Sequence, residues 1–349
     1  MTNSSHRDDD WYRSRLALPP ARPRIVIDTD AANEIDDQFA LVWALLSPQL
    51  DVEAVYAAPF SFAHRCPVPA TLQSVDWAQP PRALAPFNPP GVGMARSYRE
   101  IVTVFDKLGQ ASAGKVFHGS TGYLQSATEP LASAAADHLI ATARACTGPE
   151  PLYVVALGCV TNIASALLLA PDIADHIVVV WTSGYPSQAP QVNDSFNLEQ
   201  DLVASRLLLD CGVPHVYLPG FQVGAQLRLS LPEIERHGLG QGAMGDYLHQ
   251  IYTDNPLWPM LGMDAQHARS GVYSWVIWDL INIAWLLNPE WVPSSLVRTP
   301  RLGLDLRWEA APSRHLMREA HAVQRDAIFG DFFAKLKASS MRIGATSAG

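Results

Sequence analysis

The sequence of 349 residues has little positive charge, few cysteines and no long apolar run. Lys and Arg total 25 against 34 Asp and Glu, for a net charge of −9, and no dense basic run occurs. This balance gives no sign of nucleic-acid or membrane binding. The four cysteines show neither CxxC spacing nor the density of a secreted disulfide scaffold, which indicates a reducing, cytoplasmic compartment. The expected partner is a small molecule or a metal cation.

Other absences concern the two ends of the chain and its most apolar window. Residues 1–22 lack the apolar stretch of a signal peptide, so we expect a flexible tail there. We expect a second flexible tail over 338–349, which leaves one domain over 23–337. The most apolar window, Trp275 to Leu287, is about 13 residues long and contains two polar residues. It is too short and too polar to span a membrane, and we expect a buried helix.

Strand and helix patterns alternate along most of the chain. We expect strands at 24–28, 52–58, 152–157, 177–181 and 215–218, and helices at 36–46, 97–108, 132–146, after 161 and at 201–209. This order predicts a single α/β domain with a mostly parallel, Rossmann-like central sheet covered by helices on both faces. Residues 59–93 are rich in proline and predict a long irregular excursion, and the polar stretch beyond 298 is expected to pack on the outside. Ligands of such sheets bind beyond the carboxyl ends of the strands.

Five acidic residues fall within ten positions, 28 to 37, where the first predicted strand ends and a helix begins. Carboxylates this close repel one another unless a cation offsets the repulsion. Ca²⁺ collects several carboxylate and carbonyl oxygens, whereas the absence of nearby His or Cys argues against zinc. A purely structural explanation is that Asp36 and Asp37 cap the helix. Capping leaves Asp28 and Asp30, which belong to the preceding element, unexplained.

The segment IVIDTDAANEIDDQFAL resembles the opening motif of nucleoside hydrolases. In the usual pattern three residues separate the second Asp from the Asp pair, and here five do, as in a divergent branch whose loop is Asn-Glu-Ile-Asp-Asp-Gln. Four further segments are similar to motifs of that family: 116–119, 157–164, 195–201 and 277–279. The resemblance thus extends over most of the chain and implies the nucleoside hydrolase fold.

The resemblance also implies a metal site and a mechanism. Ca²⁺ would be held by Asp30, Asp37, Asp279 and the main-chain carbonyl of Thr161. Asp30 would act as general base on a calcium-bound water that attacks the anomeric carbon. The transition state would resemble an oxocarbenium ion, which nearby carboxylates stabilise. Relatives are usually dimers or tetramers, so a homodimer or homotetramer is expected.

Candidate substrate-binding residues follow from the same resemblance. Asp36 and Asn197 would bind ribose hydroxyls, and Ser195 and Asn193 are further candidates. An asparagine at 197 is also consistent with a simple Asx turn. Ser195 stands where the family usually has Glu, and Pro59-Phe60 stands where an Asn usually follows the second strand. Loss of the carboxylate would accommodate a modified or extended sugar, so the sequence predicts cleavage of an N-ribosyl bond without fixing the substrate.

Two candidates remain for activating the leaving base. Trp278 precedes the late Asp and resembles the branch in which a tryptophan stacks on a purine, but core packing explains it equally well. His118 is followed by Gly119, and its alternative is a surface histidine outside the site.

The sequence therefore predicts calcium-dependent hydrolysis of the N-glycosidic bond of a ribonucleoside or related N-riboside. A homologue that binds nucleosides or sugars without turnover is an alternative. A less favoured one is a magnesium-dependent haloacid-dehalogenase-type phosphatase, suggested by the Asp-Thr-Asp after the first strand. Ala32 stands where that family has Thr or Val, and Asn197 and Asp279 would have no role. No GxGxxG follows the first strand, which argues against a dehydrogenase.

Overall fold

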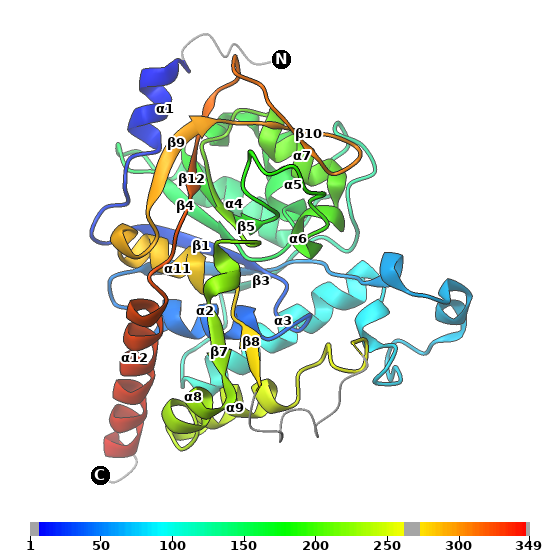
Figure 1. Cartoon of the computed structure of the whole chain (residues 1–349), viewed down its shortest axis with the longest axis vertical. Helices are drawn as coiled ribbons and strands as arrows, with labels where there is room; N and C mark the ends of the chain where they lie inside the picture. The colour runs from blue at the N-terminus through cyan, green and yellow to red at the C-terminus, as the bar shows by residue number, and fades with distance from the viewer. Residues whose placement is uncertain (1–6, 262–272, 347–349) are drawn as a thin grey trace.

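A central sheet of eight strands organises the chain (Figure 1). The computed structural model describes residues 7–261 and 273–346. The strand order is β3-β2-β1-β4-β5-β6-β12-β9, and among the eight described strands of this sheet only β9 runs antiparallel to its neighbour. The strands are β1 (Arg24–Thr29), β2 (Asp51–Ala57), β3 (Val116–His118), β4 (Leu152–Ala156), β5 (Ile177–Ser183), β6 (His215–Pro219), β9 (Ser294–Arg298) and β12 (Leu316–Ala320).

The central strands are apolar because both of their faces are covered. All residues of β4 and β5 are buried. In β1, Ile25 and Ile27 belong to one core cluster and Val26 belongs to the other, as the alternation of side chains along a strand requires. Strands covered on both sides are therefore continuous apolar runs.

Helices cover both faces of the sheet. On one face lie α2 (Asp36–Leu45), α3 (Pro90–Lys107), α11 (Leu280–Leu287) and α12 (Arg325–Thr346). On the other lie α4 (Ala134–Arg144), α5 (Thr161–Leu169) and α7 (Leu202–Asp210). This arrangement confirms the predicted mostly parallel sheet flanked by helices.

Smaller elements surround this core. They are α1 (Asp9–Arg15), α6 (Phe196–Glu199), α8 (Leu231–His237), α9 (Gly242–Thr253), the strand pairs β7 (Arg228–Ser230) with β8 (Ser274–Val276) and β10 (Arg301–Leu302) with β11 (Trp308–Glu309), and six short 3₁₀ helices, η1 (Ala63–Arg65), η2 (Pro69–Ser74), η3 (Ala85–Phe87), η4 (Pro171–Asp175), η5 (Gly224–Gln226) and η6 (Pro289–Trp291). The excursion predicted from residue 59 contains only three of these 3₁₀ turns before α3 begins at Pro90.

The sheet reverses its direction of growth between β1 and β4. From β1 the chain adds β2 and then β3 on one side, whereas β4, β5 and β6 follow on the other side. Such a switch point opens a crevice at the carboxyl ends of the two strands. The acidic segment after β1 and the segment after β4 therefore meet at one edge of the sheet.

The N-terminal segment differs from the flexible tail that we predicted. Asp9–Arg15 forms α1, and Tyr12 and Leu16 are buried in the main core. The Tyr12 hydroxyl donates a hydrogen bond of 2.7 Å to the Gly212 carbonyl. At the other end α12 continues to Thr346, so the boundary predicted at 337 falls within a helix. Residues 1–6 and 347–349, the extremes of the two predicted tails, lie outside the described residues.

Two predictions about the last third of the chain were wrong. The stretch beyond Arg298 does not all pack on the outside, because β12 lies within the main sheet between β6 and β9. The apolar window from Trp275 is not one helix. Its first residues lie in β8, and the helix begins at Leu280. Trp278 and Asp279 lie in the connection, where both side chains face the pocket described below.

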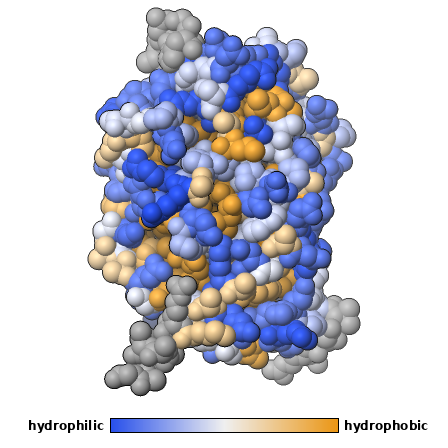
Figure 2. Space-filling view, turned by 90° about the vertical axis from the view of Figure 1, so that its left-hand side faces the viewer, coloured by the Kyte–Doolittle hydropathy of each residue, from blue (hydrophilic) through white to orange (hydrophobic). Residues whose placement is uncertain are grey.

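The surface of the molecule is largely polar on one face (Figure 2). Figure 2 shows that polar side chains predominate on the face formed by α1 and α12, with apolar side chains in small groups among them. Scattered apolar groups are ordinary on folded domains. Among the described residues, none of the helices has both the length and the apolar character that crossing a membrane requires.

Candidate active site

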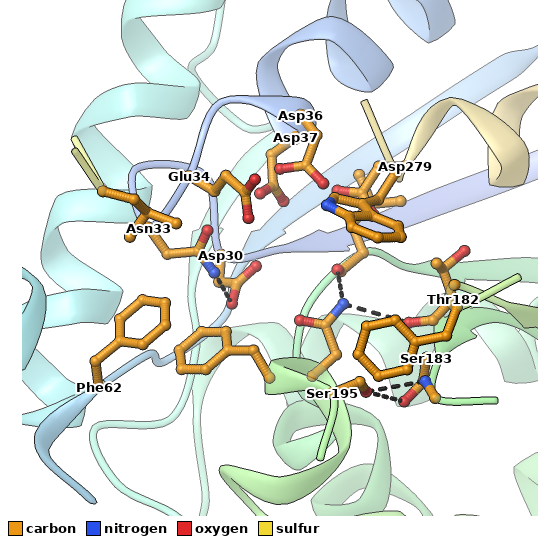
Figure 3. Close-up of a pocket in the computed structure, with 18 of the residues that line it drawn as sticks. Asp30, Asn33, Glu34, Asp36, Asp37, Phe62, Thr182, Ser183, Ser195 and Asp279 are labelled. Carbon is orange, nitrogen blue, oxygen red and sulfur yellow. Dashed lines mark hydrogen bonds between the residues drawn. The ribbon is translucent and has the colours of Figure 1, made fainter. Parts of the chain in front are cut away.

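A pocket lies at the switch point, over the carboxyl ends of the central strands (Figure 3). Acidic side chains from three elements line one end of it: Asp30 after β1, Asp36 and Asp37 at the start of α2, and Asp279 before α11. Asp279 is more than 240 residues away in sequence from the others, so only the fold brings it to them. Among the described residues this is the acidic site that the sequence predicted.

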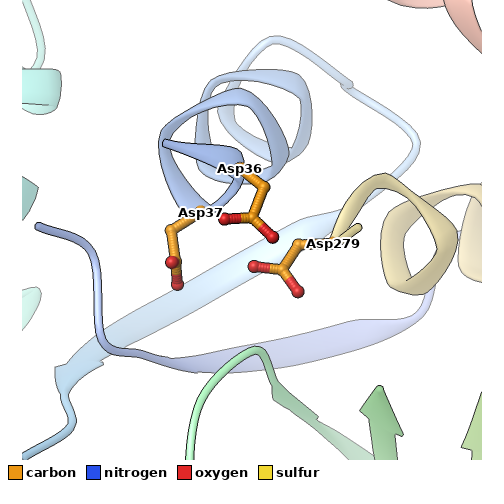
Figure 4. A group of neighbouring side chains, drawn as sticks. All are labelled: Asp36, Asp37 and Asp279. Carbon is orange, nitrogen blue, oxygen red and sulfur yellow. The ribbon is translucent and has the colours of Figure 1, made fainter. Parts of the chain in front are cut away.

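Three of these carboxylates form a compact group (Figure 4). One oxygen each of Asp36, Asp37 and Asp279 lies within 4.8 Å of the others, and all three side chains are buried. Asp37 also accepts a hydrogen bond from the Thr29 hydroxyl. The prediction had placed Asp37 and Asp279 on the metal and Asp36 on the ribose, whereas the structure groups all three.

Burial makes the negative form of these groups costly. It raises the pKa of Asp37 to about 6 and raises the pKa values of Asp36 and Asp279 well above their ordinary range, and the neighbouring carboxylates add to the rise for Asp36 and Asp279. Among the described residues, Asp279 Oδ1 is buried and accepts no hydrogen bond. Clustered, buried and partly unpaired oxygens are what a hard cation needs as ligands. The group could therefore hold a metal ion.

Asp30 is fixed next to this group. Its Oδ2 accepts hydrogen bonds from the Asn33 side chain at 2.7 Å and from Gln200 at 3.4 Å, whereas the buried Oδ1 accepts none from the described residues. Burial, followed by repulsion from Asp37, raises its pKa well above the ordinary value. Gly158 packs against the carboxyl group, since a Cβ there would lie 2.6 Å from Oδ1. Only glycine leaves room for Asp30 in this position.

The structure does not bring Thr161 to the pocket. Thr161 begins α5, and its hydroxyl donates a 2.6 Å hydrogen bond to Asp201. Leu157, which directly follows β4, lines the pocket instead, and its main-chain oxygen accepts a 2.6 Å hydrogen bond from Asn197. The amide of the neighbouring Asn162 donates to Asp28 at 2.8 Å, and burial raises the pKa of Asp28 to about 7.

The predicted ribose-binding residues differ in their placement. Asn197 lines the pocket and bridges β4 and β5, since its amide also donates to the Thr182 carbonyl at 3.2 Å. Ser195 lines the pocket and accepts a 2.9 Å hydrogen bond from the Gly184 amide. Asn193 is fully buried and is not among the lining residues. Its side chain accepts a hydrogen bond from the Tyr185 main-chain amide and donates one to the Leu306 carbonyl, so it holds the loop that carries Ser195.

Aromatic rings form further walls of the pocket. Trp278 lines it and meets Phe221 edge to face at a centroid distance of 6.0 Å. Phe62, from the excursion after β2, stacks on Phe196 with centroids 3.8 Å apart. Arg65 lies over this stacked pair and donates a hydrogen bond of 2.7 Å to the Asp194 carbonyl. Flat apolar walls of this kind suit a planar heterocycle.

His118 does not reach the pocket. It ends β3, is exposed and stacks on Tyr98 with ring centroids 3.7 Å apart. The adjacent Gly119 has a structural reason of its own, because a Cβ there would lie 2.1 Å from the Ala57 carbonyl oxygen. The His-Gly pair thus marks a close approach of two strands, and its histidine gains no support as a catalytic group.

Sequence reasoning missed several lining residues. Glu34 lines the pocket and accepts a 2.6 Å hydrogen bond from the Trp275 indole, and burial raises its pKa to about 7. It had been counted only as one acid of the cluster. Asn33 and Phe62 were not singled out. The only sequence feature that could have pointed to Asn33 is that its loop is two residues longer than in the usual motif. Nothing in the sequence indicates that Phe62 contacts Phe196.

Fold and site together define a class: a doubly wound α/β protein with a carboxylate pocket at its switch point. The model of the inosine-uridine preferring nucleoside hydrolase family matches residues 25–326. The chain belongs to this family, whose members are hydrolases that act on N-glycosyl bonds. This assignment sets aside the phosphatase alternative.

Individual relatives agree with the family assignment. The chain is 28% identical over 274 residues to the non-specific ribonucleoside hydrolase RihC of Salmonella enteritidis PT4, covering 76% of this chain and 79% of the relative. Its fold is similar to that of the purine-preferring ribonucleoside hydrolase from Gardnerella vaginalis, with a TM-score of 0.65, 18% identity, and coverage of 91% and 99% of the two chains. A plant nucleoside hydrolase, PpNRh1, is similar with a TM-score of 0.62, 16% identity, and coverage of 91% and 100%.

Proposed function

We propose that this protein hydrolyses the N-glycosidic bond of a ribonucleoside or related N-riboside, and that it depends on Ca²⁺. The observation that carries the proposal is the convergence of Asp30, Asp36, Asp37 and Asp279 in one pocket with aromatic walls. A buried acidic group and flat apolar surfaces match the two halves of a nucleoside, its sugar diol and its planar base. The same carboxylates favour turnover over a purely ligand-binding role.

In this proposal Asp36, Asp37 and Asp279 hold Ca²⁺. Asp30 and the Leu157 carbonyl, from two other residues that line the pocket, are proposed as additional oxygen ligands. Calcium prefers six to eight oxygen ligands. The ion would lower the pKa of a bound water and orient the sugar hydroxyls. Calcium acidifies water less than zinc does, so a carboxylate base is required as well.

Asp30 is the proposed base. Its free Oδ1 accepts a proton from the water as the water oxygen bonds to the anomeric carbon. The bond between that carbon and the nitrogen of the nucleobase breaks at the same time, and its electron pair leaves with the nucleobase. The surrounding carboxylates stabilise the positive charge that develops on the sugar ring. Asn197 and Ser195 bind sugar hydroxyls, and Trp278 stacks on the leaving base.

The test is a screen of purine and pyrimidine nucleosides for release of reducing sugar, with and without a chelator, on wild type and Asp30→Ala. We expect turnover by wild type that the chelator abolishes and Ca²⁺ restores. A protein that binds nucleosides, seen as a thermal shift, without releasing sugar would be the non-catalytic alternative. Sugar release unaffected by both chelator and substitution would reject the mechanism.

We further propose a cytoplasmic homodimer or homotetramer. All four cysteines are unpaired, and three of them are buried, as expected in a reducing compartment. Light scattering coupled to size exclusion measures the assembly, and a monomer at micromolar concentration would contradict this part of the proposal.

A further inference from the structure

The side chain of Asn33 makes the shortest hydrogen bond that Asp30 accepts. Its amide donates to Asp30 Oδ2 at 2.7 Å, and its main-chain N–H donates to the Asp30 carbonyl at 3.0 Å. Gln200 reaches the same Oδ2 only at 3.4 Å. Asn33 is itself buried and lines the pocket (Figure 3). One oxygen of Asp30 is therefore engaged, and the other is left to the pocket.

The loop that carries Asn33 is held in an unfavourable backbone conformation. Ala32 has φ +107°, a region that non-glycine residues rarely adopt because it strains the backbone. Such a conformation persists only where its surroundings enforce it. The Ala32 carbonyl accepts a 3.2 Å hydrogen bond from Arg96. The turn directly after Asp30 is thus fixed from outside the loop.

Arg96 connects this loop to the excursion after β2. Its guanidinium also donates to the Ala85 carbonyl at 2.7 Å and to the Asn88 side chain at 2.6 Å, and it lies 5.2 Å from the centroid of the Phe60 ring. Its three hydrogen-bond acceptors among the described residues are thus neutral oxygens. A planar guanidinium that donates to several such acceptors fixes the segments that carry them relative to one another.

No side-chain amide follows β2, because Pro59 and Phe60 stand there. The position is used structurally: the Phe60 carbonyl accepts from Asn88 at 2.9 Å, and the Pro59 carbonyl accepts from Cys159 at 3.3 Å. The shorter of the two amide hydrogen bonds to Asp30 comes from the long loop, through Asn33.

We propose that Asn33 is a positioning residue, which holds Asp30 through Oδ2 so that Oδ1 faces the attacking water, and that Arg96 fixes the loop that presents it. This inference depends on the proposed function, because Asn33 would act only through Asp30, the proposed general base. It differs from substrate binding, which would act on KM, and from metal binding, which would act on calcium affinity.

The experiment compares Asn33→Ala with wild type on the nucleoside that wild type cleaves best, at saturating Ca²⁺. Loss of a partner that orients an active-site ligand typically costs 10- to 100-fold. We therefore expect kcat to fall roughly 10- to 100-fold, with KM and the calcium affinity close to wild type. Asn33→Asp keeps the side-chain shape without the amide donor and should lose at least as much. Asn288→Ala, which removes an amide that caps η6 outside the pocket, is the matched control and should keep the wild-type kcat.

A double-mutant cycle separates positioning from general destabilisation. In an Asp30→Ala background, Asn33→Ala should cause no further loss of kcat, because residues that act as a unit are not additive. Arg96→Lys should lower kcat by a smaller factor, whereas Arg314→Lys, which removes another guanidinium bound to main-chain carbonyls, should lower Tm only.

An additive loss, a change confined to KM, a change in calcium affinity or an unchanged kcat would each overturn the assignment of Asn33. Those outcomes leave the proposed function intact as long as wild type is active and Asp30→Ala is not. An inactive wild type, or a fully active Asp30→Ala, would instead reject the proposed function itself.

Discussion

The two ends of the pocket are built in different ways. The acidic end lies on the termini of regular elements, β1, α2 and α11, and its side chains are buried. The aromatic end is carried mainly by connections: Phe62 comes from the excursion after β2, Phe221 from the turn after β6, and Phe196 from the short α6. Regular elements hold side chains more firmly than loops do. The difference indicates that chemistry belongs to the rigid end and substrate choice to the adaptable end.

The most severe test of this division is Asp30→Ala. Removing a general base typically costs 10²- to 10⁴-fold, so we expect kcat to fall by about that factor with little change in KM. Steady-state kinetics on nucleosides measures it. Asp10→Ala, at a side chain that is 95% exposed, is the control and should behave as wild type. A rise in KM with kcat unchanged would instead assign Asp30 to substrate binding.

The next largest effect is expected for Asp279→Asn. This change removes one charge of the Asp36, Asp37 and Asp279 group, so calcium affinity should fall by at least about 100-fold, more than the loss of an outer partner costs. Without metal, the variant should be at least as stable as wild type, because a buried unpaired charge has been removed. Calorimetric titration and thermal unfolding in chelator measure the two effects. Unchanged calcium affinity would contradict the proposed metal site.

The same end should respond to pH. Burial raises the pKa of Asp37 from 3.8 to about 6. A carboxyl whose pKa is higher in the folded than in the unfolded state contributes stability below about pH 4, and that contribution is lost as pH rises through about 6. Because Ca²⁺ competes with protons for these oxygens, the rise in Tm on adding Ca²⁺ should be larger at pH 8 than at pH 5. An equal rise at both pH values would contradict carboxylate ligation.

At the aromatic end we expect changes in binding and in preference between bases. Stacking on an aromatic side chain contributes about 1–3 kcal/mol per base, so Trp278→Ala should raise KM roughly 5- to 100-fold. The rise should be larger for purine than for pyrimidine nucleosides, as kinetics on both classes would show. Trp291→Phe, at a ring that stacks on Trp43 outside the pocket, is the control. A loss of kcat alone would place Trp278 at the chemical step.

The smallest effect is expected for Ser195→Ala. The Ser195 hydroxyl accepts from the Gly184 amide and contacts Ser183. It is proposed to bind a sugar hydroxyl as well, so its loss removes one neutral hydrogen bond to the substrate. At about 0.5–1.5 kcal/mol for each bond, KM should rise about 2- to 10-fold with kcat unchanged. Substrates extended at the sugar should be the least affected. A loss as large as that of Asp30→Ala would remove the distinction between the two ends.

The sequence predicted the acidic end well and the aromatic end poorly. Asp30, Asp37 and Asp279 follow or precede apolar segments, and parallel strands bring their carboxyl ends to one edge, so pattern and topology suffice. The role of Asp36 was harder to assign, because neighbouring carboxylates at a helix start differ only in direction. The Thr161 carbonyl was expected from the family resemblance, and the position of a main-chain oxygen leaves no trace in the sequence that could have pointed to another residue.

The fold shows the same limit. The buried strands β1, β2, β4, β5 and β6 were found because they are short and apolar, whereas the three-residue β3 was not predicted. β12 was missed because Arg318 and Glu319 interrupt its apolar residues. Tertiary pairing with β6 and β9 decides its conformation. The contact of Phe62 with Phe196 joins residues 134 positions apart, and no local pattern encodes it.

The position of β12 has a consequence for synthesis on the ribosome. It is the last strand of the sheet to be translated, yet it lies between β6 and β9. Until residues 316–320 emerge, the nascent chain exposes the hydrogen-bonding edge of β6, and β9 has no neighbour to pair with. Unpaired edges of this kind recruit other chains. A polypeptide released before that point should therefore aggregate, even though every residue of the acidic site has already been made.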